Sequence, residues 1–158
     1  MLGIINFLVI FMSGLIKIDV KKNIPQMDKQ TQQAFEGIVD DYSFRLLREM
    51  QVRVPVRTGA LQFGLWRLFT VTADRIFAKI LSTAPYTMIV EKGSRPHSIV
   101  AKDAKALRFT TKDGRVVFAK SVEHPGTKGR FFIRASIEAA KSILPEIIKK
   151  HLQKVGKI

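Results

Sequence analysis

His97 and His124 are the side chains of this sequence best suited to hold a metal ion or to move a proton near neutral pH. A metal site would need a third ligand, such as Glu91, Asp103 or Glu123. The sequence has no HExxH motif and no His-x-His pair, and its carboxylates form no tight cluster near the histidines. The lysines and arginines around them also oppose the binding of a cation. We therefore expect both histidines to hydrogen-bond loop backbone, and we expect neither a metal nor another cofactor.

Nucleophiles and phosphate-binding loops are also missing from the sequence. It contains no cysteine, which excludes thiol nucleophiles, disulfides and cysteine zinc sites. None of Ser94, Ser98 and Ser121 stands in a nucleophile-elbow pattern. The segment GTKG at residues 126–129 does not match the GxxxxGK(S/T) loop that cradles nucleotide phosphates. The sequence therefore shows no recognised catalytic motif, and we expect no small-molecule substrate.

Two polar segments, residues 93–105 and 121–130, carry the residues that form a candidate docking surface. They flank a predicted hairpin of strands Ala106–Thr111 and Arg115–Lys120, whose turn lies at residues 112–114. Both segments leave from the open end of this hairpin, so we expect them to be neighbours that form one basic rim. The candidate residues are Arg95, His97, Lys102, Lys105, His124, Pro125, Gly126, Thr127, Lys128 and Arg130. The rim would meet an acidic protein or phosphates; the alternative is a set of solvated loop side chains.

The net charge of the chain is unevenly distributed. It amounts to +14, and the pI is about 10.4. Residues 1–52 carry six basic and six acidic side chains, so the whole excess lies in residues 53–158. Such a field attracts nucleic acid, acidic proteins or anionic membranes, and it says nothing about the fold. No zinc finger, aromatic RNA-binding consensus or clear helix-turn-helix accompanies the charge.

The hydrophobic pattern predicts a single α+β domain. With 158 residues, 46% of them hydrophobic, the chain can bury a substantial core. The predicted elements are strands at Leu15–Lys21, Leu65–Thr72 and Arg75–Ser82, the hairpin, and helices at Met27–Val52 and Phe131–Val155. The segment Pro85–Glu91 fits either a short helix or a strand. We expect an antiparallel sheet of about four to five strands, packed by the long helix of the N-terminal half and by the C-terminal helix.

The apolar segment Met1–Phe11 has three interpretations. Translation could start at Met12, which would leave these residues as a flexible extension or as an over-extended reading frame. The segment could also be a weak membrane or signal sequence, although a spanning helix needs ~20 apolar residues. Finally, it could dock on the domain as a strand or a helix. We favour the first interpretation, and therefore expect an extension at residues 1–11 and one domain at residues 12–158.

Six blocks of the sequence resemble a known protein family. They are Val54–Leu61 (VPVRTGAL), Tyr86 with Glu91–Ser94 (EKGS), Pro96-His97, Ala104–Phe109 (AKALRF), His124–Lys128 (HPGTK) and Phe131–Ala135 (FFIRA). Their order and spacing are similar to those of the tail-completion, or head–tail joining, tail-component family of long-tailed phages and proviruses. The likeness extends over residues 15–150. The sequence departs from the family at Arg57, where an acidic residue is usual, and at Gly64-Leu65, where Ser-Ile-like residues are usual.

The resemblance implies a non-enzymatic structural protein of the virion. Such proteins assemble as a ring at the head-proximal end of the tail or in the neck, and DNA passes through the channel. We accordingly expect a homo-oligomeric ring, with six-fold symmetry, that contacts neck, tail-terminator or tail-tube proteins. Contact with the packaged DNA would be transient and independent of sequence. The expected location is the neck or tail of the virion, with the host cytoplasm as the place of assembly and no membrane attachment.

Three other functions remain as alternatives. The first is a sequence-independent nucleic-acid-binding domain, which the charge alone would suggest. The second is a metal-dependent nuclease that uses His97 and His124. The third is a membrane-attached protein held by Met1–Phe11.

Overall fold

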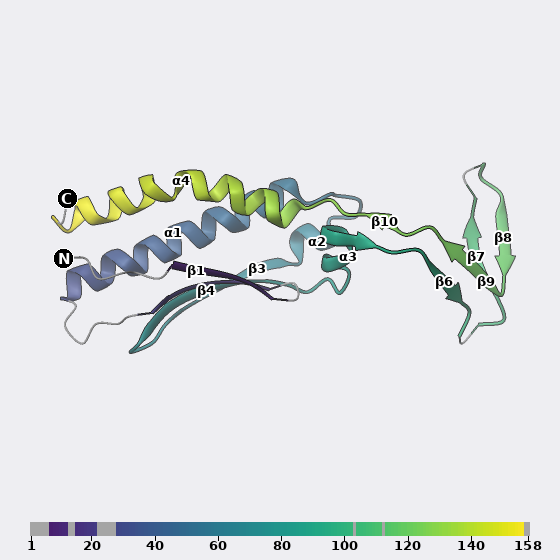
Figure 1. The fold of residues 1–158 in the computed structure, drawn as a ribbon, viewed down its shortest axis with the longest axis horizontal. Helices are drawn as coiled ribbons and strands as arrows, with labels where there is room; N and C mark the ends of the chain where they lie inside the picture. Colours follow the sequence, from purple (N-terminus) through teal and green to yellow (C-terminus); the bar gives the residue numbers. More distant parts are fainter. Residues whose placement is uncertain (1–6, 13–14, 22–27, 103, 112, 157–158) are drawn as a thin grey trace.

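The protein consists of an elongated body and a long arm (Figure 1). The computed structural model describes residues 7–12, 15–21, 28–102, 104–111 and 113–156. The body contains β1 (Phe7–Met12), β2 (Leu15–Lys21), α1 (Lys29–Arg53), α2 (Ala60–Phe63), β3 (Leu65–Val71), β4 (Arg75–Ser82), α3 (Thr87–Lys92) and α4 (Phe132–Lys154). The arm, residues 93–128, contains β5 (Gly93–Ser94), β6 (His97–Val100), β7 (Leu107–Thr110), β8 (Val116–Ala119), β9 (Ser121–His124) and β10 (Thr127–Lys128).

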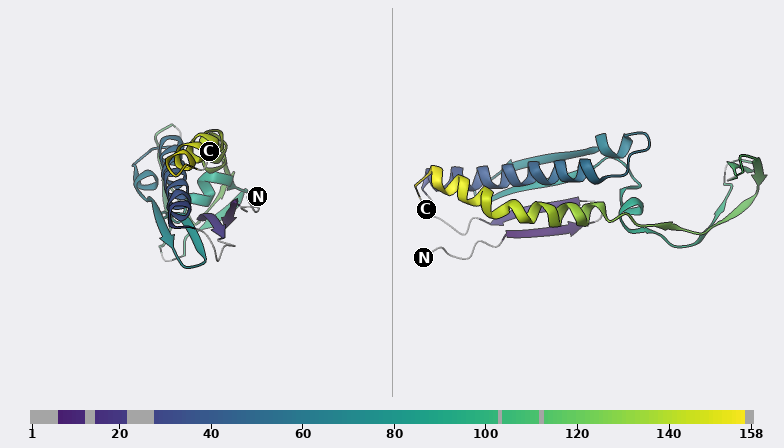
Figure 2. Two further views of the ribbon diagram at one scale, coloured as in Figure 1. Left: turned by 90° about the vertical axis from the view of Figure 1, so that its left-hand side faces the viewer. Right: turned by 90° about the horizontal axis from the view of Figure 1, so that it is seen from above.

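A four-stranded antiparallel sheet, in the order β1-β2-β4-β3, forms one layer of the body. In the register of β2 and β4, Ile16 lies opposite Ile80 and Ile18 lies opposite Ala78, and all four side chains are buried. Because successive side chains of a strand point to opposite faces, Lys17 belongs to the other face. Both long helices lie on the same side of the sheet (Figures 1 and 2). The alternating pattern of the sequence therefore builds one buried face.

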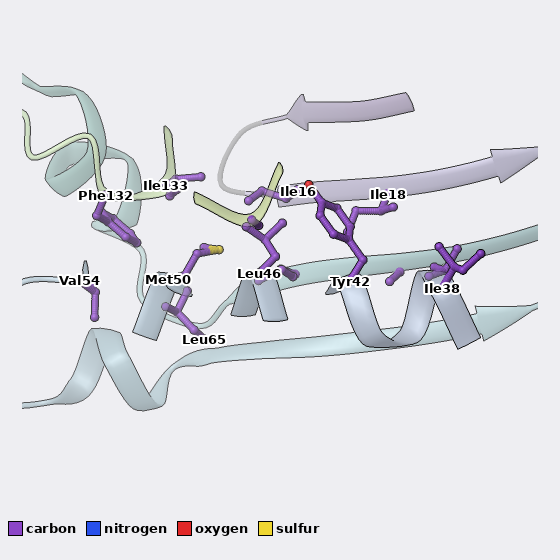
Figure 3. Packing of buried hydrophobic residues seen from close by; sticks show 14 of the residues in the cluster. Ile16, Ile18, Ile38, Tyr42, Leu46, Met50, Val54, Leu65, Phe132 and Ile133 are labelled. Atoms are coloured by element: carbon purple, nitrogen blue, oxygen red, sulfur yellow. The ribbon is translucent and has the colours of Figure 1, made fainter. Parts of the chain in front are cut away.

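The core lies between this sheet face, α1 and the start of α4 (Figure 3). The buried stripe of α1 has helical spacing and consists of Phe35, Ile38, Val39, Tyr42, Leu46 and Met50. Phe132 and Ile133 of α4 close the core at its end nearest the arm. Asp28 caps α1 by accepting a hydrogen bond from the Thr31 N–H (2.8 Å). The helix ends just before Pro55, because the residue before a proline avoids the helical conformation.

Asp41 ties α4 to α1 through two polar contacts. Its carboxylate accepts hydrogen bonds from Lys150 Nζ (2.9 Å) and from His151 Nε2 (2.8 Å). The His151 ring lies against Gly37, where any β-carbon would collide with it. The hydrogen bond from His151, supported by Lys150 and opposed by burial, lowers the pKa of Asp41 below its ordinary value. The pairing of the two helices thus contains one acid-sensitive contact.

We expect Asp41→Asn to make the stability of the protein less sensitive to acid. A carboxyl whose pKa is lowered in the folded state stabilises the fold above its unfolded pKa, and this contribution is lost as the pH falls through the folded pKa. The difference in unfolding free energy between wild type and Asp41→Asn should shrink as the pH falls below about 5. Urea titrations over a pH series measure this difference, and Glu123→Gln, at an exposed carboxyl of β9 on the arm, is the control. A difference that stays the same down to about pH 3 would contradict the assignment.

The structure confirms the predicted α+β class and most of the predicted elements. α1 and α4 match the two predicted helices, and β2, β3, β4 and the β7–β8 hairpin match predicted strands, all within two residues at each end. The ambiguous segment after Ser82 forms the short helix α3. These elements were predictable because each packs one apolar side on a core or carries a clear turn signal.

Two expectations about the strands are corrected by the structure. The β7–β8 hairpin is not part of the main sheet; it is a separate two-stranded ribbon at the far end of the arm (Figure 1). The segments expected to be polar loops contain strands that pair with one another, β6 with β9 and β5 with β10. The sequences HSIV and SVEH of β6 and β9 lack a regular apolar face because this ribbon covers no core.

Part of the apolar N-terminal segment belongs to the main sheet. β1 pairs antiparallel with β2, from Phe7 opposite Val20 to Met12 opposite Leu15. For residues 7–12 this pairing corresponds to the interpretation in which the segment docks as a strand, and not to a flexible extension. The expected domain boundary between residues 11 and 12 falls inside β1. Residues 1–6 lie outside the described residues, and a translation start at Met12 stays a prediction.

Candidate functional site

The arm is a ribbon of two antiparallel segments that leaves the body after α3 and returns to it at α4 (Figures 1 and 2). Its strands pair at three levels: β5 with β10 at the root, β6 with β9 further out, and β7 with β8 at the tip. In the middle level His97 lies opposite His124, and Val100 lies opposite Ser121. This pairing confirms that the two polar segments, far apart in sequence, are neighbours in space.

The two candidate histidines form hydrogen bonds with the backbone of nearby turns of the arm. Their rings lie side by side, with centroids 5.1 Å apart. His97 Nδ1 donates a hydrogen bond to the carbonyl oxygen of Arg95 (2.9 Å), and His124 Nδ1 accepts one from the N–H of Gly126 (3.0 Å). Within the described residues, no group of three or more His, Cys, Asp or Glu side chains could hold a metal ion. The hydrogen bonds of both rings are with loop backbone, as the sequence predicts.

The candidate cations lie at successive levels of the arm. Lys128 and Arg130 stand at the root, Arg95 stands between the first two pairs of strands, and Lys102 and Lys105 lie close to the tip hairpin. All five are exposed, and none forms an ion pair with another described residue. The five cations therefore lie one after another along the arm and do not form the single basic rim that the sequence predicts.

Glycines allow the two segments of the arm to cross closely at its root. Gly93 has φ of 82° and ψ of −177°, a conformation that is essentially restricted to glycine. A β-carbon on Gly93 would collide with the carbonyl oxygen of Thr127 and would lie 2.7 Å from the nitrogen of Gly129. At Gly126, which has φ of 87°, a β-carbon would lie 2.9 Å from the carbonyl carbon of Arg95. The glycines of the EKGS and HPGTK blocks are thus required by close contact between backbones.

Glu91 holds the start of α4 against the end of α3. Its side chain is buried, with 4% of the residue exposed. The carboxylate accepts hydrogen bonds from the N–H groups of Ile133 (2.8 Å) and Arg134 (3.2 Å). Phe131, the residue before α4, has φ of 51° and provides no capping side chain. Glu91 therefore acts as the N-terminal cap of α4 from another element, a role that no local sequence signal indicates.

Apolar side chains are exposed on the outer half of the arm. Phe118 is 66% exposed and Val100 is 57% exposed, and Ile99 and Val116 are also open to solvent. The arm carries them away from the body (Figure 1), so the body of the same molecule does not cover them. Several exposed apolar side chains on a projecting element are typical of an interaction surface.

A hollow of about 480 Å³ lies where the arm joins the body. Its lining includes Arg57, Leu61, Tyr86, Val90, Lys128 and Arg130. Lys128 and Arg130 are among the residues that the sequence predicts for the docking surface, whereas Arg57 and Tyr86 are not. Tyr86 belongs to a block that carries the family resemblance, whereas Arg57 departs from the family. No local pattern marks either residue, because residues from three separate parts of the chain meet here only after folding. We call this feature the root hollow.

Comparisons with known proteins add no assignment to this geometry. No family model, no curated protein and no solved structure matches the chain. In the part of the chain that the structure describes, no helix is long and apolar enough to span a membrane. The arm and the root hollow therefore carry the functional argument.

Proposed function

We propose that this protein is a structural subunit of the neck or tail of a long-tailed phage particle. In this proposal its copies assemble side by side as a ring at the head-proximal end of the tail, complete the tail and join it to the head. DNA passes through the channel of the ring. The single observation that carries the proposal is the arm, which projects from the body (Figure 1) and whose apolar side chains are exposed.

An arm of this kind favours contact between unlike surfaces of neighbouring molecules. The outer arm is a two-stranded ribbon, which is at best marginally stable alone in water. Burying Phe118 and Val100 against another molecule would stabilise the ribbon as well as the contact. If the arm of one copy lies on the body of the next, the contact is heterologous, and it closes into a ring when the rotation between copies allows. A ring with six-fold symmetry remains our expectation.

The proposed partners follow from the position of such a ring. Neighbouring rings of neck, tail-terminator or tail-tube proteins would meet its upper and lower surfaces. Packaged DNA would touch it transiently and without sequence preference, through the exposed lysines and arginines. The protein would reside in the neck or tail of the virion and would assemble in the host cytoplasm.

We expect Phe118→Ser to weaken ring assembly by about tenfold or more, because large apolar side chains at the centre of a contact dominate its free energy. The free energy of unfolding of the subunit should stay within about 0.5 kcal/mol of wild type, since this side chain is exposed in the isolated molecule. Multi-angle light scattering after gel filtration and negative-stain electron microscopy measure the assembly. Urea unfolding measures the stability.

Phe63→Ser is the matched control for this experiment. Phe63 is 83% exposed, but it lies in α2 of the body and not on the arm. The proposal predicts that rings of Phe63→Ser form at wild-type concentrations. A wild-type protein that stays monomeric at all concentrations would contradict the proposed function. Equal weakening of assembly by both substitutions would contradict the role of the arm.

A sequence-independent nucleic-acid-binding domain is the second candidate function. Residues 93–130 contain nine lysines and arginines against three acidic residues, and a two-stranded ribbon fits the major groove of DNA. This candidate predicts submicromolar binding of duplex DNA by the isolated protein, with a steep loss of affinity as salt rises. Absence of binding at ~50 mM salt would exclude it.

A further inference from the structure

We infer that the root hollow binds an acidic peptide segment of a partner protein. The inference deepens the proposed function and rests on it for the nature of the partner, which would be another protein of the particle. The binding site itself is argued from the shape, charge and construction of the hollow.

The charge of the root hollow is uncompensated. Three cationic side chains, Arg57, Lys128 and Arg130, line it, and no carboxylate does. None of the three forms an ion pair with another described residue. Two other hollows of the surface differ in this respect: Asp41 and Glu146 line the groove between α1 and α4, and Glu91 and Glu138 line the hollow beside the start of α4. Like charges held together without a counter-ion favour an anionic ligand.

The backbone around the hollow is fixed by hydrogen bonds. Lys128 pairs with Gly93 at the root of the arm. The N–H of Arg130 donates to the carbonyl oxygen of Val90 (2.8 Å), which fixes the backbone of the next cation. Gly59 is buried with φ of 80°, so the turn that carries Arg57 has a conformation that other residues rarely adopt. A ligand therefore meets cations whose backbone is already ordered, and less conformational entropy is lost on binding.

The shape of the hollow favours a peptide over duplex DNA. Leu61, Val90 and the ring of Tyr86 add apolar surface between the cations. A duplex presents its phosphates on a convex surface, which suits the projecting arm better than a hollow of about 480 Å³. A peptide can place a carboxylate against each cation and an apolar side chain between them.

The acidic segment is more readily supplied by a different protein than by a second copy of this chain. Most described carboxylates of this chain are already engaged within their own molecule: Asp19, Asp40, Asp41, Glu49, Asp74, Asp113 and Glu138 in ion pairs, and Asp28 and Glu91 in helix caps. Glu123 and Glu146 have no such partner among the described residues, and they lie on separate elements, β9 and α4. Within the described residues, therefore, no segment presents several carboxylates that lack an ion pair or a cap close together.

Fluorescence anisotropy with a labelled short peptide of alternating Glu and Leu tests the inference. The control probes are the same peptide with Gln in place of Glu, and a labelled DNA duplex. Two full-length triple variants lose the same charge: a root variant, Arg57→Gln with Lys128→Gln and Arg130→Gln, and a tip variant, Lys102→Gln with Lys105→Gln and Arg108→Gln. All six side chains are exposed, so both variants should fold, which circular dichroism verifies.

We expect the wild type to bind the Glu–Leu peptide at about 50 mM salt and to bind the Gln–Leu peptide far more weakly. The root variant should lose about tenfold or more in affinity for the Glu–Leu peptide, while the tip variant loses less than about threefold. Equal losses in the two variants would show a general effect of charge and overturn the inference. So would a wild type that does not bind the peptide, or a root variant that loses affinity only for DNA.

Light scattering on the same proteins separates this inference from the proposed function. A wild type that forms rings but does not bind the peptide overturns the inference and leaves the proposed function standing. A wild type that binds the peptide through the root hollow but never assembles overturns the proposed function and leaves the binding site standing.

Discussion

Replacement of Glu91 by alanine is expected to lower the free energy of unfolding by about 3 kcal/mol. The buried carboxylate accepts two hydrogen bonds from the first turn of α4, at the N–H groups of Ile133 and Arg134. Alanine removes both acceptors and leaves the Ile133 N–H in a buried position without its partner. It also removes a negative charge from the positive end of the helix dipole. Urea unfolding followed by circular dichroism measures the loss.

Glu91→Gln separates the hydrogen bonds from the charge. Glutamine keeps one acceptor oxygen but presents an NH₂ group where the second acceptor was. We therefore expect the free energy of unfolding of Glu91→Gln to lie between that of wild type and that of Glu91→Ala. Glu146→Gln, an exposed carboxylate in the same helix as the two donors, should change the free energy by less than about 0.5 kcal/mol. If Glu91→Ala were as stable as wild type, the cap would have no structural role.

The sequence alone is sufficient to predict those helices and strands of the body that pack on the core. Ile16 and Ile18 alternate with Lys17, and the apolar residues of α1 repeat at helical spacing, so period alone identified a strand and a long helix. The tip hairpin was predictable because Asp113-Gly114 is a strong turn signal. Its place outside the main sheet was not, because the period of a strand does not tell which strand it pairs with.

The candidate site was predictable only in part, for a similar reason. Hairpin geometry brought His97 near His124, and the structure confirms this pairing. The order of three levels along the arm depends on the short ribbons β5–β10 and β6–β9, which cover no core and leave no periodic pattern. The Glu91 cap and the root hollow join distant residues, so no local signal exists for either.

The blocks that carry the family resemblance meet at the root of the arm. The Val54–Leu61 block and Tyr86 line the root hollow, and the EKGS and HPGTK blocks supply the strands that cross there. The Phe131–Ala135 block begins α4, whose first turn Glu91 caps. The structure of this one junction thus explains residue types that are spread over much of the chain. Glycine is needed where two backbones are close, glutamate caps α4, and phenylalanine closes the end of the core. The direction of the arm depends on this junction.

Gly93→Ala is therefore expected to release the arm from the body while leaving the core folded. The substitution adds strain at a conformation essentially restricted to glycine, and its β-carbon would enter the space of the Thr127 carbonyl oxygen. We expect local opening of the root to become easier by about 2–4 kcal/mol, or roughly 30- to 1,000-fold. Hydrogen exchange measures this at the N–H groups of Arg130 and Phe131, which donate to carbonyl oxygens of the α3 segment. Ring assembly should be lost along with this protection.

Gly114→Ala distinguishes crowding at the root from conformational strain alone. Gly114 has the same φ of 82°, but a β-carbon there would have no heavy atom within 4 Å. Alanine at this position should therefore impose only the backbone cost of about 1–2 kcal/mol, confined to the tip turn, and exchange at Arg130 and Phe131 should not change. If both substitutions accelerated exchange at the root equally, the close crossing of the two segments would not determine the position of the arm. If only Gly93→Ala did so and rings still formed, the arm would be fixed by the root but would not be needed for assembly, and the proposed function would lose the observation that carries it.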